Sequence, residues 1–271
     1  MAFFRIKGGA EVDIAKKEAL AKLETSEILT RKPVGIKFLF TKEEYEACPV
    51  EEARAKMAYC VMVKTASLGV CMKTDIAKCI CGGGTRAVGL EEPSERYFTG
   101  CEAYSFGLYR DLAVAKQEVN SLTFCKHHTH GLLIQPLEAY EDYDPDVVIL
   151  FSNSFGTMRL IQGYTYHYGP QPNFKMTGNQ ALCSECTAYP YETNSMNISM
   201  FCSGTRYLAG WSDTEIGIGM PYGIFKGVCD GLYLSANGVE KDSRKAVLRE
   251  NLKKAGLEDP GLEDGKAYYM A

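Results

Sequence analysis

The residues of this sequence that could do chemistry are above all its cysteines. The chain has 11 cysteines among 271 residues, a density below that of small disulfide-stabilised domains. The densest group is formed by Cys71, Cys79 and Cys81, which Gly82, Gly83 and Gly84 follow directly. Thiolates bind soft metals and iron–sulfur clusters, and neighbouring glycines let backbone N–H groups approach a cluster sulfur or an anion. This segment is therefore a candidate cofactor site.

A second group of cysteines lies in the other half of the chain. Cys183 and Cys186 have the two-residue separation of zinc knuckles and redox motifs, and Cys202 follows. The run of closely spaced cysteines found in bacterial ferredoxins is absent from the sequence, so a cluster would have to be assembled from distant segments. We expect Cys81, Cys183 and Cys202 as ligands, with Cys186 as the candidate fourth.

The turn that follows Cys202 could bind an anion. Ser203, Gly204 and Arg206 supply a hydroxyl, a small residue and a guanidinium, which suit a carboxylate or phosphate. Together with Gly82 and Gly83 they are the predicted cofactor-binding residues. The glycines do not form a dinucleotide or P-loop motif, and the sequence lacks a hydrolase nucleophile motif.

Charge and hydropathy limit the partners. The formal net charge of −4 gives no general attraction to nucleic acid or to an anionic membrane. No segment approaches 18 apolar residues, and the first residues do not resemble a secretory signal. We therefore expect a cytoplasmic protein with reduced thiols, without nucleic-acid or membrane partners. A homo-oligomer is left open.

Alternating helix and strand patterns must position these residues. Helical periodicity is predicted for 11–29, 51–67, 110–122, 154–166, 221–232 and 242–255, and strands for 34–40, 131–137, 146–151, 198–202 and 215–220. Cysteine-bearing loops are expected at 70–90 and 170–191. The fold class is mixed α/β (α+β), as one compact unit.

The two halves also share a weak pattern. Each has a proline, a strand, a helical segment and a cysteine-bearing loop, and Cys81 and Cys183 are 102 positions apart. Two pseudo-repeated halves, each with a short sheet, are therefore an open alternative. The corresponding division is an N-terminal half at 1–130, a C-terminal half at 131–240, and a solvated helix and tail at 241–271.

Several segments together resemble the family called domain of unknown function 169 (DUF169). They are Pro33–Phe38, Cys81–Gly84, Pro145–Ile149, Phe174–Cys183, Asn197–Arg206 and Glu215–Pro221. The resemblance covers about residues 30–235 and implies a shared pattern at Cys81, Cys183, Cys202 and Arg206. The cysteines at 71, 79, 101 and 186 are not part of that pattern.

These observations lead to one main hypothesis and two alternatives. The main hypothesis is a metal- or iron–sulfur-binding protein with a redox or electron-transfer role, acting with a redox partner or a small-molecule substrate. The first alternative is a metal-free module in which tyrosine-rich stretches and the Cys202–Arg206 turn line a pocket for a small anionic molecule. The second is a thiol enzyme whose nucleophilic cysteine would need a histidine or a lysine nearby, for which His127–His130 are candidates. Whether the protein is an enzyme is left open.

Overall fold

The chain divides into two compact units, each built from separate stretches of sequence. The computed structural model describes residue 12, residues 14–141 and residues 143–270. The helical unit comprises 1–30, 152–174 and 222–271, and the sheet unit comprises 31–151 and 175–221. The contiguous division predicted from the sequence, at 1–130, 131–240 and 241–271, stays a prediction, as does the internal repeat.

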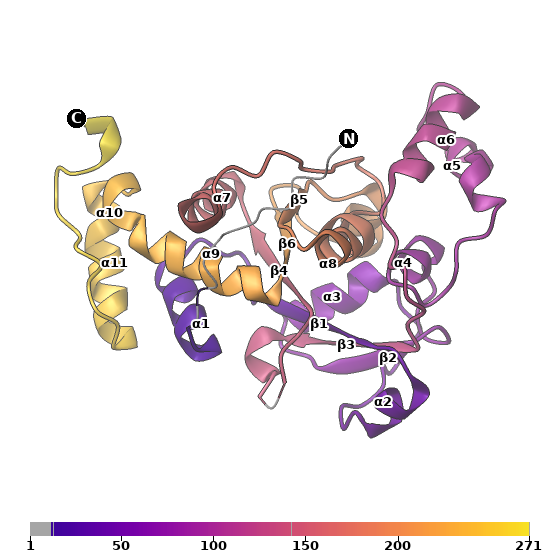
Figure 1. Cartoon of the computed structure of the whole chain (residues 1–271), viewed down its shortest axis with the longest axis horizontal. Coiled ribbons are helices and arrows are strands. Elements are labelled where there is room, and N and C mark those ends of the chain that lie inside the picture. Colours follow the sequence, from indigo (N-terminus) through magenta and orange to yellow (C-terminus); the bar gives the residue numbers. More distant parts are fainter. Residues whose placement is uncertain (1–11, 13, 142, 271) are drawn as a thin grey trace. The chain divides into compact units, whose positions relative to one another are not determined.

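The sheet unit is built on one six-stranded sheet (Figure 1). Its order is β2 (Met72–Asp75), β3 (Gly131–Pro136), β1 (Val34–Leu39), β4 (Val147–Ser152), β6 (Ile216–Pro221) and β5 (Asn197–Ser199). The pairs β2–β3, β1–β3, β1–β4 and β5–β6 are antiparallel. Every residue of β3 and β4 is buried, which explains their nearly continuous apolar sequences. The predicted mixed α/β fold is confirmed.

Short helices cover the sheet and carry the residues of interest. α3 (Tyr59–Ser67) packs on β1 and β3, and the π-helical segment η3 (Ala181–Ala188) packs on β5 and β6. α4 (Gly82–Ala87) contacts both α3 and η3, and a second π-helical segment, η4 (Gly204–Leu208), contacts α3. The other elements are α2 (Lys42–Ala47), η1 (Tyr97–Thr99), α5 (Cys101–Ser105), α6 (Leu112–Ser121), η2 (Leu137–Ala139) and α8 (Tyr189–Thr193).

The helix expected at 51–67 is shorter than its pattern suggests, because its first part pairs with a strand. The backbone of Glu51 and Ala53 exchanges two hydrogen bonds of 2.9 Å with Lys73 of β2. This pairing holds the segment beside the sheet, and α3 begins only at Tyr59. Tertiary pairing has overridden local helix propensity here. Likewise, the loop expected at 70–90 contains β2 and α4.

The helical unit consists of α1 (Lys16–Thr25), α7 (Ser154–Tyr168), α9 (Tyr222–Leu234), α10 (Ala236–Val239), α11 (Asp242–Ala255) and η5 (Tyr268–Met270). Residues 11 and 13 of the helix expected at 11–29 lie outside the described residues. α7 and α9 approach closely where Gly163 meets Gly231, since a Cβ at Gly231 would lie 2.1 Å from the Gly163 carbonyl oxygen. This contact needs glycine on α9.

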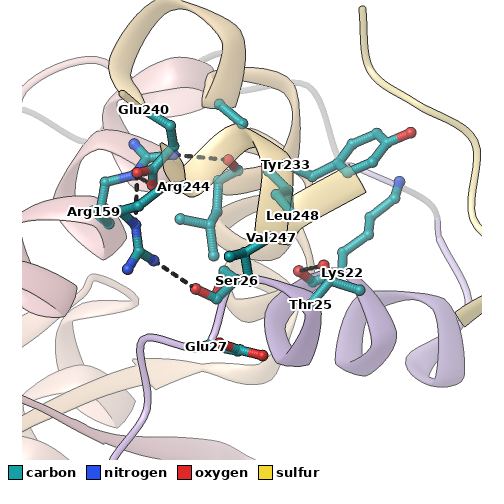
Figure 2. Close-up of a pocket in the computed structure, with 12 residues that line it drawn as sticks. Lys22, Thr25, Ser26, Glu27, Arg159, Tyr233, Glu240, Arg244, Val247 and Leu248 are labelled. Carbon is teal, nitrogen blue, oxygen red and sulfur yellow. Dashed lines mark hydrogen bonds and ion pairs between the residues drawn. The ribbon is translucent and has the colours of Figure 1, made fainter. Parts of the chain in front are cut away.

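A buried ionic network joins these helices around a small cavity of about 90 Å³ (Figure 2). Arg159, which is 1% exposed, donates to Glu240 at 2.7 Å, and Arg244 donates to the other oxygen of Glu240 at 2.9 Å. Arg159 also donates to Gln162 and to the carbonyl of Leu232. Because these donors already have partners within the protein, and because removing one partner of a buried ion pair is destabilising, we assign the network a structural role.

The described residues include no helix that is both long and apolar enough to cross a membrane.

Candidate functional site

The sheet unit contains a cavity of about 560 Å³, within the range of small-molecule sites. Its wall comes from the start of α3, from α4, from the α5 region, from residues 178–183 and from η4 with the residues before it. Most of the lining is apolar, and it includes Leu182, Phe106, Leu108 and Leu208.

Four cysteines line this cavity. Cys81, Cys183 and Cys202, three of the four predicted ligands, are joined there by Cys60. Cys60 comes from the first turn of α3, Cys81 immediately precedes α4, and Cys183 lies within η3. All are free thiols. The thiol of Cys202 lies 3.4 Å from the backbone nitrogen of Thr205, which donates a hydrogen bond to it.

Burial holds two of these thiols in their neutral form. It raises the pKa of Cys60 to about 12, with a further contribution from the neighbouring Cys81 and Cys202. Burial also raises the pKa of Cys183 well above its ordinary value, again with Cys81 and Cys202 nearby. A neutral thiol is a weak donor and acceptor, so these side chains act chiefly as small apolar groups.

The predicted metal- or cluster-binding function is wrong. Among the described residues, no group of three or more histidine, cysteine, aspartate or glutamate side chains is arranged to hold a metal ion. Metal ligation requires thiolates that converge on one point. The four cysteines line the same cavity, but burial opposes ionisation of Cys60 and Cys183 to thiolates.

Cys186, the expected fourth ligand, packs on the sheet and does not line the cavity. A Cβ at Gly217 of β6 would lie 3.1 Å from its sulfur, and one at Gly219 would lie 2.0 Å from its carbonyl oxygen. Cys186 is fully buried against these glycines. The π-helical turn, closed by bonds from residue i to i+5, separates residues three positions apart more than an α-helix does.

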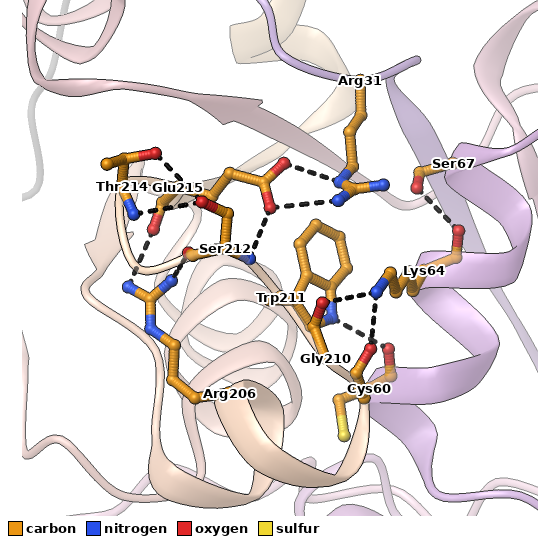
Figure 3. Close-up of polar contacts among 11 residues, drawn as sticks. Arg31, Cys60, Lys64, Ser67, Arg206, Gly210, Trp211, Ser212, Thr214 and Glu215 are labelled. Atoms are coloured by element: carbon orange, nitrogen blue, oxygen red, sulfur yellow. Dashed lines mark hydrogen bonds and ion pairs between the residues drawn. The ribbon is translucent and has the colours of Figure 1, made fainter.

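The predicted anion-binding residues have different positions. Gly82, Gly83, Ser203 and Gly204 line the cavity. Arg206 is outside its lining. Its guanidinium donates to the carbonyl oxygens of Ser212 and Glu215 (Figure 3). It also donates to the carbonyl oxygen of Met200 and lies over the ring of Phe201.

Arg206 therefore closes a turn of the chain. With its hydrogen-bond donors given to backbone carbonyls, it is not available to an anion at the Cys202–Arg206 turn. The hydrogen bonds of Arg206 therefore give no support to the alternative of an anion-binding module at that turn.

The histidines are also placed apart from the thiols. His127 and His128 line a separate open cavity with Phe40 and Tyr191. The cysteine-lined cavity has no histidine in its wall. The alternative of a thiol enzyme activated by these histidines therefore lacks the contact on which it depends.

The charged groups at the cavity are paired with each other. Arg86 donates to Glu102 at 3.2 Å, and its guanidinium stacks over the ring of Tyr97 at 4.4 Å. This pair therefore leaves no unpaired charge at the cavity. Arg86 and Glu102, which come from α4 and α5, tie these two helices together at the edge of the cavity.

Both π-helical segments of the sheet unit contribute to the wall of the cavity. η3 supplies Ala181, Leu182 and Cys183, and η4 supplies Gly204, Thr205 and Leu208. π-Helical turns are rare in proteins, and those that occur are frequently found at functional sites. Periodicity in the sequence did not reveal either of them.

The fold and the cavity define a mixed α/β protein with a cysteine-lined pocket. The model of the DUF169 family, described as "Uncharacterised ArCR", matches residues 22–231. The chain belongs to this family, as its sequence predicted.

The chain is also similar to an uncharacterized protein, MJ0308, of Methanocaldococcus jannaschii. The two are 25% identical over 221 residues, which are 80% of this chain and 93% of the relative. No solved structure matches the chain.

Proposed function

We propose that the cysteine-lined cavity binds a small organic molecule whose surface is mostly apolar. The observation that carries this proposal is the cavity itself, which has the volume of a small-molecule site and a mainly apolar lining. The proposal differs from the anion-binding alternative in the charge of the ligand and in giving no role to Arg206, which does not line the cavity.

Exposed apolar side chains around the cavity support the proposal. Phe106, Leu108 and Leu208 line it, yet each is more than half exposed, at 62%, 56% and 74%. They come from the segment after α5 and from the end of η4. A ligand seated among them would remove apolar surface from water, at about 25 cal/mol per Å².

Ligand-detected NMR can monitor a binding titration with p-cresol, which is an apolar ring with one hydroxyl group. Saturable binding with one site is expected. Gly204→Met should weaken binding at least tenfold, because the new side chain enters the cavity. A Cβ at Gly204 meets only the Cys202 sulfur at 3.8 Å and Leu208 at 4.0 Å, so the variant should fold.

Gly223→Met is the matched control. Gly223 lies at the start of α9, has nothing within 4 Å of an added Cβ, and is outside the cavity lining. This variant should bind p-cresol as the unmodified protein does. Absence of saturable binding, or equal affinity in the Gly204→Met variant, would contradict the proposal.

A further inference from the structure

One polar group of the cavity wall has no partner. Gln180 is 9% exposed and lines the cavity, and its Oε1 is buried without a hydrogen bond within the described part of the chain. Buried polar atoms are nearly always paired, so an orphaned acceptor in the wall of a cavity needs an explanation. A bound ligand that donates a hydrogen bond would supply one.

The other end of the Gln180 amide is held in place. Its Nε2 donates to the hydroxyl oxygen of Tyr97. The side chain also lies against Gly83, where a Cβ would come within 3.3 Å of the Gln180 Cγ and Cδ atoms. Gly83 therefore makes room for this amide, which gives the glycine a role different from the predicted contact with an anion.

The backbone of Gln180 is fixed as well. Its φ of 50° lies in the left-handed region, which is costly for a residue other than glycine. The conformation is maintained because its carbonyl accepts the backbone N–H of Ser184 at 3.0 Å and of Glu185 at 3.2 Å, where η3 begins. The orphaned acceptor is thus presented by a preorganised residue.

The charges around Gln180 do not favour an anion. Arg86 is paired with Glu102, and the carboxyl of Glu118 lies 3.4 Å from the Asn179 side-chain amide, next to Gln180 in the chain. A carboxylate ligand could not donate to Gln180 Oε1, and the cavity offers it no unpaired cation from the Arg86–Glu102 pair. A carboxamide or a hydroxyl group can donate and needs no counter-charge.

We propose that Gln180 is a specificity-determining residue that selects ligands with an uncharged hydrogen-bond donor, such as a carboxamide or a hydroxyl group, attached to an apolar body. This inference rests on the proposed function of the cavity and names the class of its ligand. The apolar body lies among Leu182, Phe106 and Leu208, and the donor group meets Gln180.

Two probes of the same shape test this proposal, namely 4-methylbenzamide and 4-methylbenzoate. The unmodified protein should bind the amide about tenfold more tightly, because one hydrogen bond is made with the amide and an acceptor is left unpaired with the carboxylate. Equal affinities, or a preference for the carboxylate, would overturn the proposal.

Gln180→Met is the variant that isolates the residue, since methionine has a similar length and no amide. The tenfold preference for the amide should fall to about one, and p-cresol, whose hydroxyl group would also donate to Gln180 Oε1, should bind more weakly than it does to the unmodified protein. Gln117→Met, at an exposed position of α6, is the matched control and should keep the preference. If Gln180→Met keeps it as well, the proposal is wrong.

The outcomes separate this inference from the proposed function. If neither p-cresol nor the two probes bind, the proposed function of the cavity fails and the inference fails with it. If p-cresol binds at the cavity but the amide and the carboxylate bind equally, only the role of Gln180 is overturned. Should Gln180→Met not fold, the comparison of the two probes on the unmodified protein decides alone.

Discussion

The indole Nε1 of Trp211 donates a hydrogen bond of 3.3 Å to the carbonyl oxygen of Cys60 (Figure 3). This bond ties the segment after η4 to the first turn of α3, the two elements that bring Cys202 and Cys60 to the cavity. Trp211 is 3% exposed and packs on Phe151, with ring centroids 4.6 Å apart. Trp211 therefore holds elements of the cavity wall together without lining the cavity itself.

Trp211→Phe should lower the free energy of unfolding by about 1–3 kcal/mol. The variant keeps an aromatic ring but loses the hydrogen bond and part of the packing. Urea unfolding followed by far-UV circular dichroism measures the effect. In the unmodified protein, Trp211 is the single tryptophan, so its fluorescence should report unfolding of the sheet unit. An unchanged urea midpoint in the variant would contradict this role for the indole.

The ion pair between Arg31 and Glu215 also supports Trp211. Arg31 Nε donates to Glu215 at 2.6 Å, and its guanidinium lies 4.8 Å from the centre of the Trp211 ring. Glu215 is nearly buried. Glu215→Gln should destabilise the protein by about 2–4 kcal/mol, because a partly buried guanidinium loses its counter-charge.

A surface pair provides the control for that prediction. Lys32 and Glu138 are about half exposed at an N–O distance of 2.5 Å, so Glu138→Gln should change stability by less than about 1 kcal/mol. Urea unfolding of the two variants under identical conditions makes the comparison. Equal losses in both variants would show that the buried position of Glu215 does not matter.

Glu185 should make stability depend on pH. Burial raises the pKa of this carboxyl above its ordinary value of 4.5, although Ser199 and Thr177 donate hydrogen bonds to it. Protonated Glu185 is therefore favoured in the folded state. The associated stability is complete below pH 4.5 and is lost as the pH rises through the raised folded pKa, by up to about 1.4 kcal/mol per pH unit.

Glu185→Gln should remove this loss, since glutamine does not ionise and can still accept from Thr177. The unmodified protein should thus become less stable relative to the variant between pH 4 and pH 8. Urea unfolding at several pH values measures this difference. Curves for the two proteins that run parallel over this range would show that Glu185 does not titrate as its burial requires.

Thiol reactivity should map the cavity. Cys71 and Cys101 are exposed and should alkylate first with iodoacetamide, whereas buried Cys183 and Cys186 should react only on unfolding. Cys81 and Cys202 are partly buried and line the cavity, so they should react at intermediate rates. Saturating p-cresol should slow alkylation at Cys81 and Cys202, whereas Cys71 and Cys101 should keep their rates.

Mass spectrometry of the alkylated peptides resolves the individual rates. Cys71 and Cys101 serve as internal controls, because neither lines the cavity. Slowing at these two sites, or none at Cys81 and Cys202, would place the p-cresol site elsewhere.

The sequence predicted the fold class and the family correctly, and it selected three of the four cavity cysteines. The metal-ligand role that it predicted for these cysteines is wrong. The helix expected to begin at residue 51 would have placed Cys60 near its middle. Because residues 51–53 pair with β2, α3 begins at Tyr59 and Cys60 lies in its first turn. Cys186 matched a ligand spacing, but the π-helical geometry and two glycines of β6 direct it to the sheet.

Gln180 lies in the Phe174–Cys183 segment that carries the family resemblance, but nothing in the sequence gave it a role. Its role depends on a left-handed backbone, on the hydroxyl of Tyr97 and on the space above Gly83, which come from three separate segments. Such a constellation has no local period or motif. The nearest clue was the glycine at position 83. A side chain there would enter the space that the Gln180 amide occupies.

Ligand binding at Gln180 is tested most directly by an NMR titration with 4-methylbenzamide that follows the side-chain amide signals of this residue. We predict a saturable shift of these signals, together with the backbone signals of Gly83 and Gly204, and loss of the shift in the Gly204→Met variant. A saturable shift confined to residues outside the cavity, or no shift at all, would contradict this prediction.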